Sequence, residues 1–369
     1  MQLRGSKQAA VAGGAVIAAL ALAACSSSSS STPAATGSTT GSSTASAAAS
    51  GSGTLNAAGS SFQNTFQEAA IAAFKSVNPN IKVNYDSVGS GTGRSDLYSN
   101  TVLMAGSDSP IGASEKSKVP AGKTVLYFPV VIGPITLSYN LSGISNLKLS
   151  PTVIANIFQG NIKSWNDPAI KALNPGVSLP STAITTAVRS DSSGTTQNFT
   201  LFLQDAAPSV WKLGSGSTIK WPSTAHAGAQ NGGVASIIKS TPGAIGYVDY
   251  STAKASGLTF ASVQNKAGDY VAPSPAAASA DAAGATIKAD LTFAAADASS
   301  AATAYPLTYQ SWDLVYAQQP NANDVAMLKA YLGYLLGAGQ QLLPSLFYAP
   351  LPSGLDQKAV AQLSQITSS

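Results

Sequence analysis

Hydrophobic and polar positions follow two periods along most of the chain, one typical of helices and one typical of strands. Apolar residues spaced three or four apart predict helices at 62–74 and 324–336. Strict alternation predicts a strand at 81–85, and a nearly continuous apolar run predicts a buried strand at 125–132. A chain that switches between these two periods is expected to form an α/β fold, with helices layered on a sheet.

Shorter segments continue the same alternation. The further strands expected are at 135–139, 183–188 and 244–248, and the further helices are at 153–158, 195–203 and 355–366. Residues 273–304 are rich in Ala and carry no clear period, so no element is predicted there. No repeat of 20–50 residues is present, which argues against a solenoid or a propeller.

The first 24 residues have the pattern of a secretory signal peptide. Arg4 and Lys7 give a basic start, and an apolar stretch of small residues follows at 9–24, too short for a typical membrane span. The stretch ends in Leu-Ala-Ala-Cys at 22–25, which resembles the bacterial lipobox. We therefore expect cleavage before Cys25 and acylation of its thiol and amino group. An ordinary signal peptide with a chance cysteine is the alternative.

Residues 25–53 are predicted to be the lipidated cysteine and a flexible tether. From residue 26 onward this segment is almost wholly Ser, Thr, Ala and Gly, and it has no apolar side chain larger than Ala to bury. The folded body is therefore expected to occupy residues 54–369.

Composition narrows the class of protein and of site. A length of 369 residues favours two domains, and a charged fraction of 10% argues against a disordered chain. A single Cys excludes an intrachain disulfide. A single His excludes a multi-His metal site and leaves His226 as the one candidate for a Ser-His-Asp triad. A net charge of +4 is too small for a dense basic face, so no nucleic-acid partner is expected.

Three short turns of Gly, Ser and Thr stand where predicted strands end or helices begin. They are Gly-Ser-Ser-Phe at 59–62, Ser-Gly-Thr-Gly at 90–93 and Ser-Ser-Gly-Thr at 192–195. Small residues let backbone N–H groups and hydroxyls approach an anion, and a helix N-terminus favours negative charge. Such turns also cap helices without binding anything, so each one alone indicates an oxyanion site only weakly.

Two charged groups beside these turns add chemistry. A guanidinium at Arg189 is suited to donate two hydrogen bonds to an oxyanion, and Asp191 is placed to orient it; a surface ion pair is the alternative. Asp108 lies in the acidic turn 106–110. It would repel a fully ionised anion and accept a hydrogen bond from a protonated one, which favours phosphate over sulfate. A plain turn aspartate is the alternative.

Seven motifs, in order along the chain, resemble the phosphate-binding lipoprotein of the high-affinity bacterial phosphate ABC transporter. They lie at 59–62, 83–91, 106–110, 128–133, 157–168, 189–195 and 242–247. Two departures stand out. The first motif has Ser-Ser where the family often has Ala-Thr, and Arg94 stands where the family often has an apolar residue. Arg94 is therefore left outside the site, either at the cleft rim or in solvent.

The resemblance implies a two-lobed periplasmic-binding-protein fold of type II, the Venus-flytrap arrangement, in which two α/β lobes close on one phosphate. Lobe I would comprise residues 54–130 and 305–369, and lobe II residues 131–304. Two crossovers, near 130–131 and 305–306, would join them.

The resemblance also implies which residues bind the anion. Each of these residues has a donor or an acceptor that would face the phosphate; they are Ser61, Phe62, Ser90, Asp108, Arg189, Ser193, Gly194 and Thr195. Asp108 would accept the phosphate proton, Asp191 would orient Arg189, and Ser60 would add a backbone contact.

We therefore expect a solute-binding protein that captures inorganic phosphate and delivers it to an ABC transporter permease for import, with no enzymatic activity, metal or cofactor. It is expected outside the cytoplasm, as a monomer anchored to the cell membrane through Cys25. A receptor for another tetrahedral oxyanion, sulfate or molybdate, is an alternative. A secreted phosphatase would need metal ligands or an activated nucleophile, and a structural lipoprotein would need no ligand.

Overall fold

The computed structural model describes residues 51–352 and 354–369. The predicted signal peptide, Cys25 and nearly all of the predicted tether lie outside this part of the chain. The first strand, β1 (Gly53–Gly59), begins on the last residue assigned to the tether. Ser52 also exchanges hydrogen bonds with Asn323, at 3.1 Å through its N–H and at 2.8 Å through its carbonyl. The ordered contacts therefore begin slightly before residue 54.

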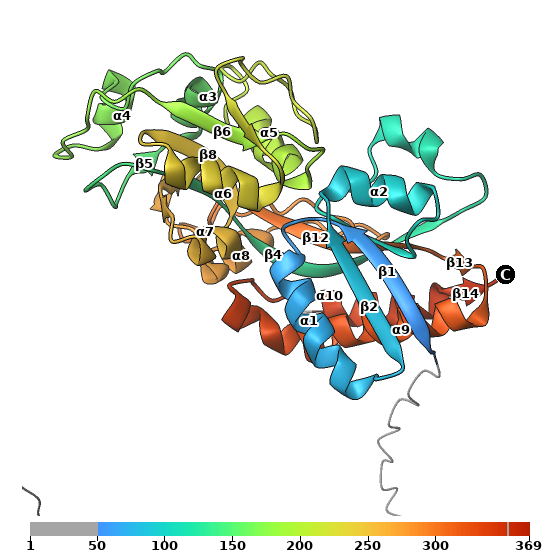
Figure 1. The fold of residues 1–369 in the computed structure, drawn as a ribbon. Coiled ribbons are helices and arrows are strands. Elements are labelled where there is room, and N and C mark those ends of the chain that lie inside the picture. The colour runs from blue at the N-terminus through green and yellow to red at the C-terminus, as the bar shows by residue number, and fades with distance from the viewer. Residues whose placement is uncertain (1–50, 353) are drawn as a thin grey trace, which may run out of the picture. The chain divides into compact units, whose positions relative to one another are not determined.

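A nine-stranded mixed sheet runs through the described residues (Figure 1). The strands follow the order β2-β1-β3-β12-β4-β8-β6-β7, and β9 pairs with the end of β4. Besides β1, their bounds are β2 (Ile81–Ser87), β3 (Met104–Ser107), β4 (Val125–Tyr139), β6 (Thr185–Arg189), β7 (His226–Gly228), β8 (Ala244–Asp249), β9 (Thr259–Phe260) and β12 (Thr308–Tyr316). Strands β1, β2 and β3 are parallel, as are β6, β7 and β8.

One long strand, β4, belongs to both ends of the sheet. Its first ten residues pair antiparallel with β12, and its last five pair antiparallel with β8. The sequence predicts two strands here, at 125–132 and 135–139, because a continuous apolar run is followed by a segment that alternates. Pro129 lies beside a register shift opposite Ser311 and Trp312, and Pro134 lies at the end of the β12 ladder. At both places the missing N–H disturbs the ladder little. The predicted crossover positions fall on β4 and just before β12.

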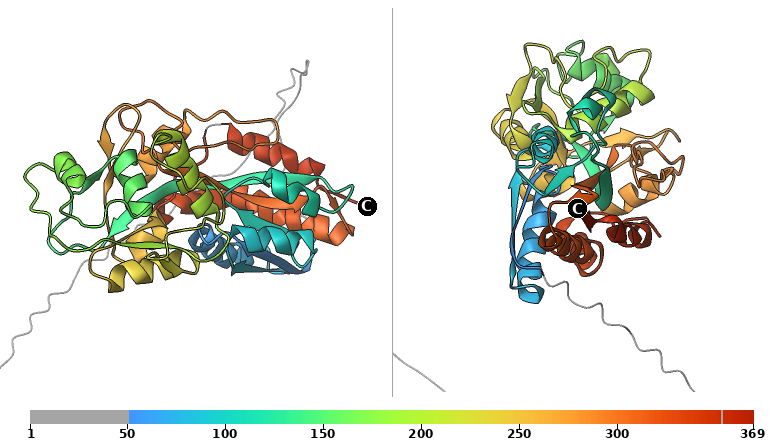
Figure 2. Two further views of the ribbon diagram at one scale, coloured as in Figure 1. Left: turned by 90° about the horizontal axis from the view of Figure 1, so that it is seen from above. Right: turned by 90° about the vertical axis from the view of Figure 1, so that its right-hand side faces the viewer.

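Helices cover both ends of the sheet (Figures 1 and 2). At the β1–β2–β3 end they are α1 (Asn64–Val77), α2 (Ser90–Tyr98), α9 (Ala322–Leu336) and α10 (Leu355–Gln362), and α9 contacts α1 and α10. The remaining helices are α3 (Pro151–Phe158), α4 (Pro168–Leu173), α5 (Gly194–Ala206), α6 (Gln230–Ser240), α7 (Tyr250–Ala255) and α8 (Pro275–Ala282). These layers confirm the predicted α/β class.

Short elements complete the described chain. The strands β5 (Lys148–Leu149), β10 (Ser262–Gln264) and β11 (Tyr270–Val271) form a small sheet, and β13 (Gln318–Gln319) pairs with β14 (Thr367–Ser368). Three 3-10 helices are η1 (Ala113–Lys118), η2 (Ala338–Leu346) and η3 (Leu363–Gln365). The predicted last helix at 355–366 is thus divided into α10, η3 and an extended end.

The Ala-rich segment 273–304 contains a helix that the hydrophobic period did not predict. Ser274 caps α8 by accepting a hydrogen bond from the Ala277 N–H at 3.1 Å. The buried face of α8 consists largely of alanines, among them Ala278 and Ala282, and it contacts β4 and β12. Alanine gives little contrast between a buried and an exposed face, so the period is weak although the helix propensity is high.

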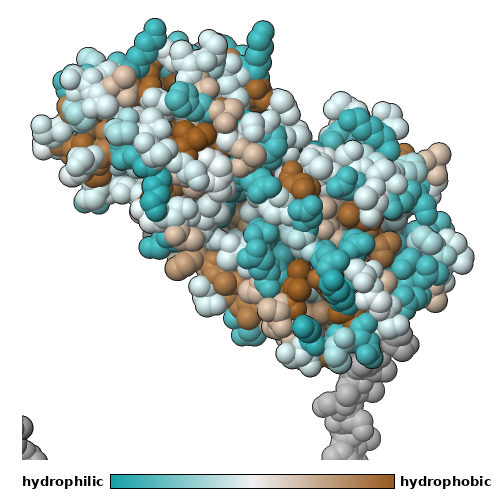
Figure 3. Space-filling model, viewed as in Figure 1, coloured by the Kyte–Doolittle hydropathy of each residue, from teal (hydrophilic) through white to brown (hydrophobic). Residues whose placement is uncertain are grey.

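The surface carries few large exposed apolar side chains. Among the described residues these are Val77, Phe347 and Val360. On the face shown in Figure 3, hydrophobic residues lie in small groups among polar ones. Within the described part of the chain, every helix is too short or too polar to cross a membrane.

Candidate functional site

The predicted anion-binding residues lie where parallel strands end. Strands β1, β2, β3 and β6 finish at Gly59, Ser87, Ser107 and Arg189, and the predicted residues follow each of these ends within a few positions. Strands β1–β3 run in the same direction as β4, whereas β6–β8 run in the opposite direction, so the carboxyl ends of the two groups point toward each other near the middle of β4. In α/β proteins ligands bind at the carboxyl ends of the strands. The fold therefore gathers turns that are far apart in the sequence.

Asp108 is almost fully buried, with 1% of its surface exposed, and hydroxyl groups surround it. The Ser311 hydroxyl donates to its Oδ1 at 2.6 Å, the Ser60 hydroxyl donates to the same oxygen, and the Ser90 hydroxyl donates to Oδ2 at 3.3 Å. Burial raises the pKa of Asp108, whereas these serines and the charge of Arg189 act in the opposite direction. The carboxyl group is thus a buried acceptor with no direct cationic partner among the described residues.

Arg189 is also buried, but it is paired. Its Nε donates to Asp191 Oδ1 at 2.8 Å, its Nη2 donates to Asp191 Oδ2, and its Nη1 donates to Thr195 Oγ1 at 3.4 Å. Burial raises the pKa of Asp191, but the hydrogen bonds and charge of Arg189 outweigh it, so the pKa lies below its usual value. The pair fixes the plane of the guanidinium. Arg189 and Asp191 thus lie in contact, and the role of Asp191 in orienting Arg189 toward an anion stays a prediction.

The N-terminus of α5 faces the Asp108 turn across the sheet. Ser193 caps α5 by accepting a hydrogen bond from the Thr196 N–H at 3.2 Å. A Cβ atom on Gly194 would lie 2.6 Å from Asp108 Cβ and 2.7 Å from Ser90 Oγ. Only glycine permits this approach, which brings the positive end of the α5 dipole next to the buried carboxyl group.

Ser61 and Phe62 form the turn that leads from β1 into α1. The Phe62 N–H donates to Ser60 Oγ at 3.1 Å, and the Phe62 ring lies 4.0 Å from the Tyr309 ring, measured between centroids. The Ser61 hydroxyl accepts two hydrogen bonds from Asn231 of α6. The aromatic packing holds this turn in place, so that its hydroxyls and N–H groups stay at the carboxyl end of β1.

Several side-chain contacts at the predicted site could not be read from the sequence. Ser60 was expected to contribute only a backbone contact, yet its hydroxyl donates to Asp108. Asn198 Nδ2 donates to the carbonyl oxygens of Asp108 at 2.7 Å and Gly194 at 2.9 Å. Ser311 lies in β12, about 200 positions from its partner. Single polar residues inside helices and strands have no motif, so their contacts become visible only after folding.

Arg94 is fully buried, so its placement in solvent is wrong. Its Nη2 lies 3.0 Å from Glu115 Oε2, and its Nη1 donates to the hydroxyls of Ser107 at 2.8 Å and Ser109 at 3.1 Å. These serines flank Asp108. A buried guanidinium needs a carboxylate and further acceptors, and Glu115 of η1 supplies that carboxylate from a segment where the sequence predicted no element.

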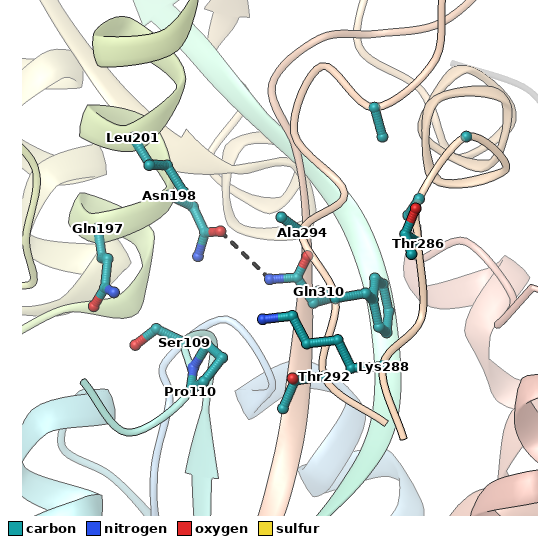
Figure 4. A pocket seen from close by; sticks show the side chains of 14 residues that line it. Ser109, Pro110, Gln197, Asn198, Leu201, Thr286, Lys288, Thr292, Ala294 and Gln310 are labelled. Atoms are coloured by element: carbon teal, nitrogen blue, oxygen red, sulfur yellow. Dashed lines mark hydrogen bonds between the residues drawn. The ribbon is translucent and has the colours of Figure 1, made fainter. Parts of the chain in front are cut away.

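A separate cavity of about 460 Å³ lies behind the Asp108 turn (Figure 4). Ser109, Asn198 and Gln310 form its inner wall, and Lys288 extends into it from the loop that follows α8. None of the predicted anion-binding residues lines this cavity. Asn198 lines the cavity and also donates to the Asp108 carbonyl, so this residue lies between the cavity and the predicted site.

The described residues contain no cluster of three or more His, Cys, Asp and Glu side chains suited to a metal ion. The polar groups near Asp108 and Arg189 are hydroxyls, amides and one guanidinium, which suit an oxyanion and not a metal cation.

Comparison with known proteins identifies the family. The model of the PBP superfamily domain matches residues 44–338. "Phosphate-binding protein PstS 3" of Mycobacterium leprae is 35% identical over 320 residues, which cover 84% of this chain and 85% of that protein. "Phosphate-binding protein PstS" of Pasteurella multocida is 36% identical over 314 residues, covering 84% and 89%. This chain belongs to the PBP superfamily and to its PstS phosphate-binding protein family. The relatives are named as binding proteins and not as enzymes, in agreement with the expected lack of enzymatic activity.

Solved structures agree on the fold. A phosphate-binding protein from Stenotrophomonas maltophilia superposes with a TM-score of 0.66 at 20% identity, covering 84% of this chain and 94% of that one. A putative phosphate ABC transporter substrate-binding protein from Clostridium perfringens gives a TM-score of 0.60 at 16% identity, covering 81% and 100%. The periplasmic-binding-protein fold expected from the sequence is therefore confirmed.

Proposed function

We propose that this PstS family member binds inorganic phosphate between the facing carboxyl ends of the strands β1–β3 and β6–β8, and delivers it to the permease of an ABC transporter for import. The observation that carries the proposal is the placement of one buried, hydroxyl-bonded carboxyl group, Asp108, against the N-terminus of α5 beside a buried guanidinium, Arg189. The names of the relatives support the same ligand.

The predicted ligand residues offer donors of two kinds. Arg189 supplies a full positive charge in fixed orientation, and Ser61, Phe62, Ser90, Ser193, Gly194 and Thr195 supply hydroxyls and backbone N–H groups. Donors that are already oriented lose little entropy when an oxyanion arrives. The net charge of the site stays small, so the anion is held mainly by directed hydrogen bonds.

Asp108 is the element of this site that discriminates among tetrahedral anions. A phosphate that carries a proton donates its P–OH to the buried carboxylate. A sulfate has no such proton at neutral pH, so it would bring a negative charge against Asp108 without a hydrogen bond. We therefore propose phosphate, and not sulfate or molybdate, as the ligand.

Calorimetric titration of the full-length protein with phosphate, arsenate and sulfate tests this assignment. We expect one phosphate per chain, competition by arsenate because it is a protonated tetrahedral ion of similar shape, and no binding of sulfate at the same concentrations. Phosphate should also raise the melting temperature, because it binds only the folded state. Sulfate binding as tight as phosphate binding would overturn the assignment.

We also propose that the protein acts outside the cytoplasm as a monomer, held to the cell membrane by lipid on Cys25. The proposal rests on the lipobox-like segment at 22–25 and on the family membership. Replacing Cys25→Ser and separating membranes from medium tests the anchor. The wild-type protein is expected in the membrane fraction and the variant outside it; equal distributions would contradict lipidation.

A further inference from the structure

Asn231 of α6 contacts Ser61, one of the proposed phosphate-binding residues. Its backbone N–H and its side-chain Nδ2 both donate to Ser61 Oγ, at 3.3 and 3.1 Å. Both residues are buried, with 8% of Ser61 and 1% of Asn231 exposed. Ser61 follows β1 and Asn231 belongs to the α6 turn next to β7, so this contact joins the two ends of the sheet.

The two donors determine what the Ser61 hydroxyl can do. A hydroxyl has two acceptor lone pairs and one hydrogen. Asn231 occupies both lone pairs, and within the described residues the hydroxyl donates to no protein acceptor. Its hydrogen is therefore free to be donated to a ligand oxygen, and the oxygen that receives it must carry a lone pair rather than a proton.

Asn231 is itself held in one orientation. Its Oδ1 accepts a hydrogen bond from the Asp249 N–H at 3.3 Å, which assigns Nδ2 to the side facing Ser61. The preceding residue, Gln230, adopts a left-handed backbone with φ +59°, an uncommon conformation for a residue other than glycine. The Gln230 N–H donates to Asp191 Oδ1 at 2.9 Å, and its side chain donates to the Ser87 carbonyl. One strained turn therefore contacts both Ser61 and the partner of Arg189.

We propose that Asn231 is a positioning residue that makes the Ser61 hydroxyl an obligate donor to the bound oxyanion. This inference rests on the proposed function. The anion would then be oriented by two different contacts, with its protonated oxygen at Asp108 and an unprotonated oxygen at Ser61. The left-handed backbone at Gln230 places this residue against Asp191 and the next one in the chain against Ser61.

The test is a double-mutant cycle on phosphate affinity in the full-length protein, using Asn231→Ala and Ser61→Ala. Asn231→Ala should weaken binding up to about tenfold in the wild-type background, because the Ser61 hydroxyl, bonded then only by the backbone N–H of residue 231, can turn its hydrogen away from the anion, and one lost hydrogen bond to an anion has at most about this effect. In the Ser61→Ala background the same substitution should change the affinity less than about twofold, because the hydroxyl it positions is gone. Ser236→Ala, on the exposed side of α6, is the matched control and should leave affinity unchanged.

A second variant gives a readout that a purely structural role would not move. In Asn231→Asp the new carboxylate accepts the Ser61 hydrogen and turns it away from the ligand, so affinity should fall well beyond the loss in Asn231→Ala. The ratio of variant to wild-type dissociation constants should decrease as the pH is lowered toward 5 and the new carboxyl group binds a proton. This variant has nearly the shape of the wild type, so it remains informative if Asn231→Ala does not fold.

The outcomes separate this inference from the proposed function. If the wild-type protein binds phosphate but the two substitutions are additive, or if the loss in Asn231→Asp is independent of pH, the positioning role is wrong and the proposed function stands. If the wild-type protein binds no phosphate, the proposed function fails, and this inference fails with it.

Discussion

Asp108 and Asp191 lie in the same region of the molecule, but their environments give them opposite properties. Asp108 is surrounded by serine hydroxyls, and burial raises its pKa. Asp191 is bonded to a guanidinium, and that partner lowers its pKa despite burial. The comparison shows that neighbours, and not the residue type, assign a carboxyl group to accepting a proton or to orienting a cation.

Removing the positive charge of Arg189 should have the largest effect on phosphate binding. Arg189→Ala removes the full positive charge that we propose faces the anion, and it leaves Asp191 without a cationic partner. The expected cost is about 3–5 kcal/mol of binding free energy, or roughly a hundredfold to several thousandfold in the phosphate dissociation constant. Titration calorimetry measures it. His226→Ala, in β7 of the same sheet, should leave binding nearly unchanged, and equal effects of the two substitutions would contradict the site.

Neutralising Asp108 should change the selectivity between phosphate and sulfate more than the affinity for phosphate. In Asp108→Asn the amide no longer repels a fully ionised oxygen, and it can donate a hydrogen bond to one. Phosphate binding should weaken roughly tenfold to a hundredfold, while sulfate binding strengthens. Competition between the two anions measures the ratio, with the exposed Asp269→Asn as control. A ratio that stays at the wild-type value would show that Asp108 does not select the ligand.

Removing the orienting carboxylate should have a smaller effect. Asp191→Asn keeps the charge of Arg189 but loses most of the hydrogen bonding that fixes its plane. We expect phosphate affinity to fall about tenfold, measured by calorimetry at pH 7. Asp205→Asn, an exposed position near the end of α5, is the matched control. Full wild-type affinity in Asp191→Asn would mean that Arg189 is oriented by other contacts.

The smallest effect concerns stability and pH. Burial raises the pKa of Asp313 to about 7, that of Asp281 to about 7 and that of Asp249 to about 6. Between about pH 4 and 7 the folded state still holds protons that the unfolded state has already released. The free energy of unfolding therefore falls as the pH rises through that window. The lowered pKa of Asp191 acts in the opposite direction, but its contribution is already complete by pH 5.

Thermal unfolding without phosphate measures this pH dependence. We expect the melting temperature to drop between pH 5 and pH 8, and the drop to shrink in Asp313→Asn, which cannot ionise. The same drop in Asp313→Asn as in the wild type would show that burial of this carboxyl group does not control the dependence.

The sequence predicted much of the fold because its signals are local. The helices at α1 and α9 and the strand β2 have clear periods, and their observed bounds differ from the predicted ones by only a few residues. Two local signals were misleading. The change of hydrophobic pattern along β4 suggested two strands where there is one, and the uniform Ala content of α8 hid a helix. In both cases the tertiary environment outweighed the local pattern.

The turns that carry the candidate site were also visible in the sequence, because Gly, Ser, Thr, Asp and Arg cluster there and match the order of a known family. Which groups surround each of these residues was not visible. The hydroxyl of Ser311, the amide of Asn198 and the Arg94–Glu115 pair meet the Asp108 turn only because β12, α5 and η1 fold against it. Hydrogen bonds between distant segments depend on ångström-scale geometry, and no sequence period encodes them.

The sequence by itself thus determined the α/β class, the family and the chemical types at the strand ends, since these follow from side-chain periodicity and short contiguous motifs. Only the tertiary structure decided that Asp108 is buried among hydroxyls, that Arg94 is paired inside the protein and that Asn231 contacts Ser61. The physical reason is that burial and pairing, which set the charge and the donor direction of each group, are properties of the packed chain and not of its neighbours in sequence.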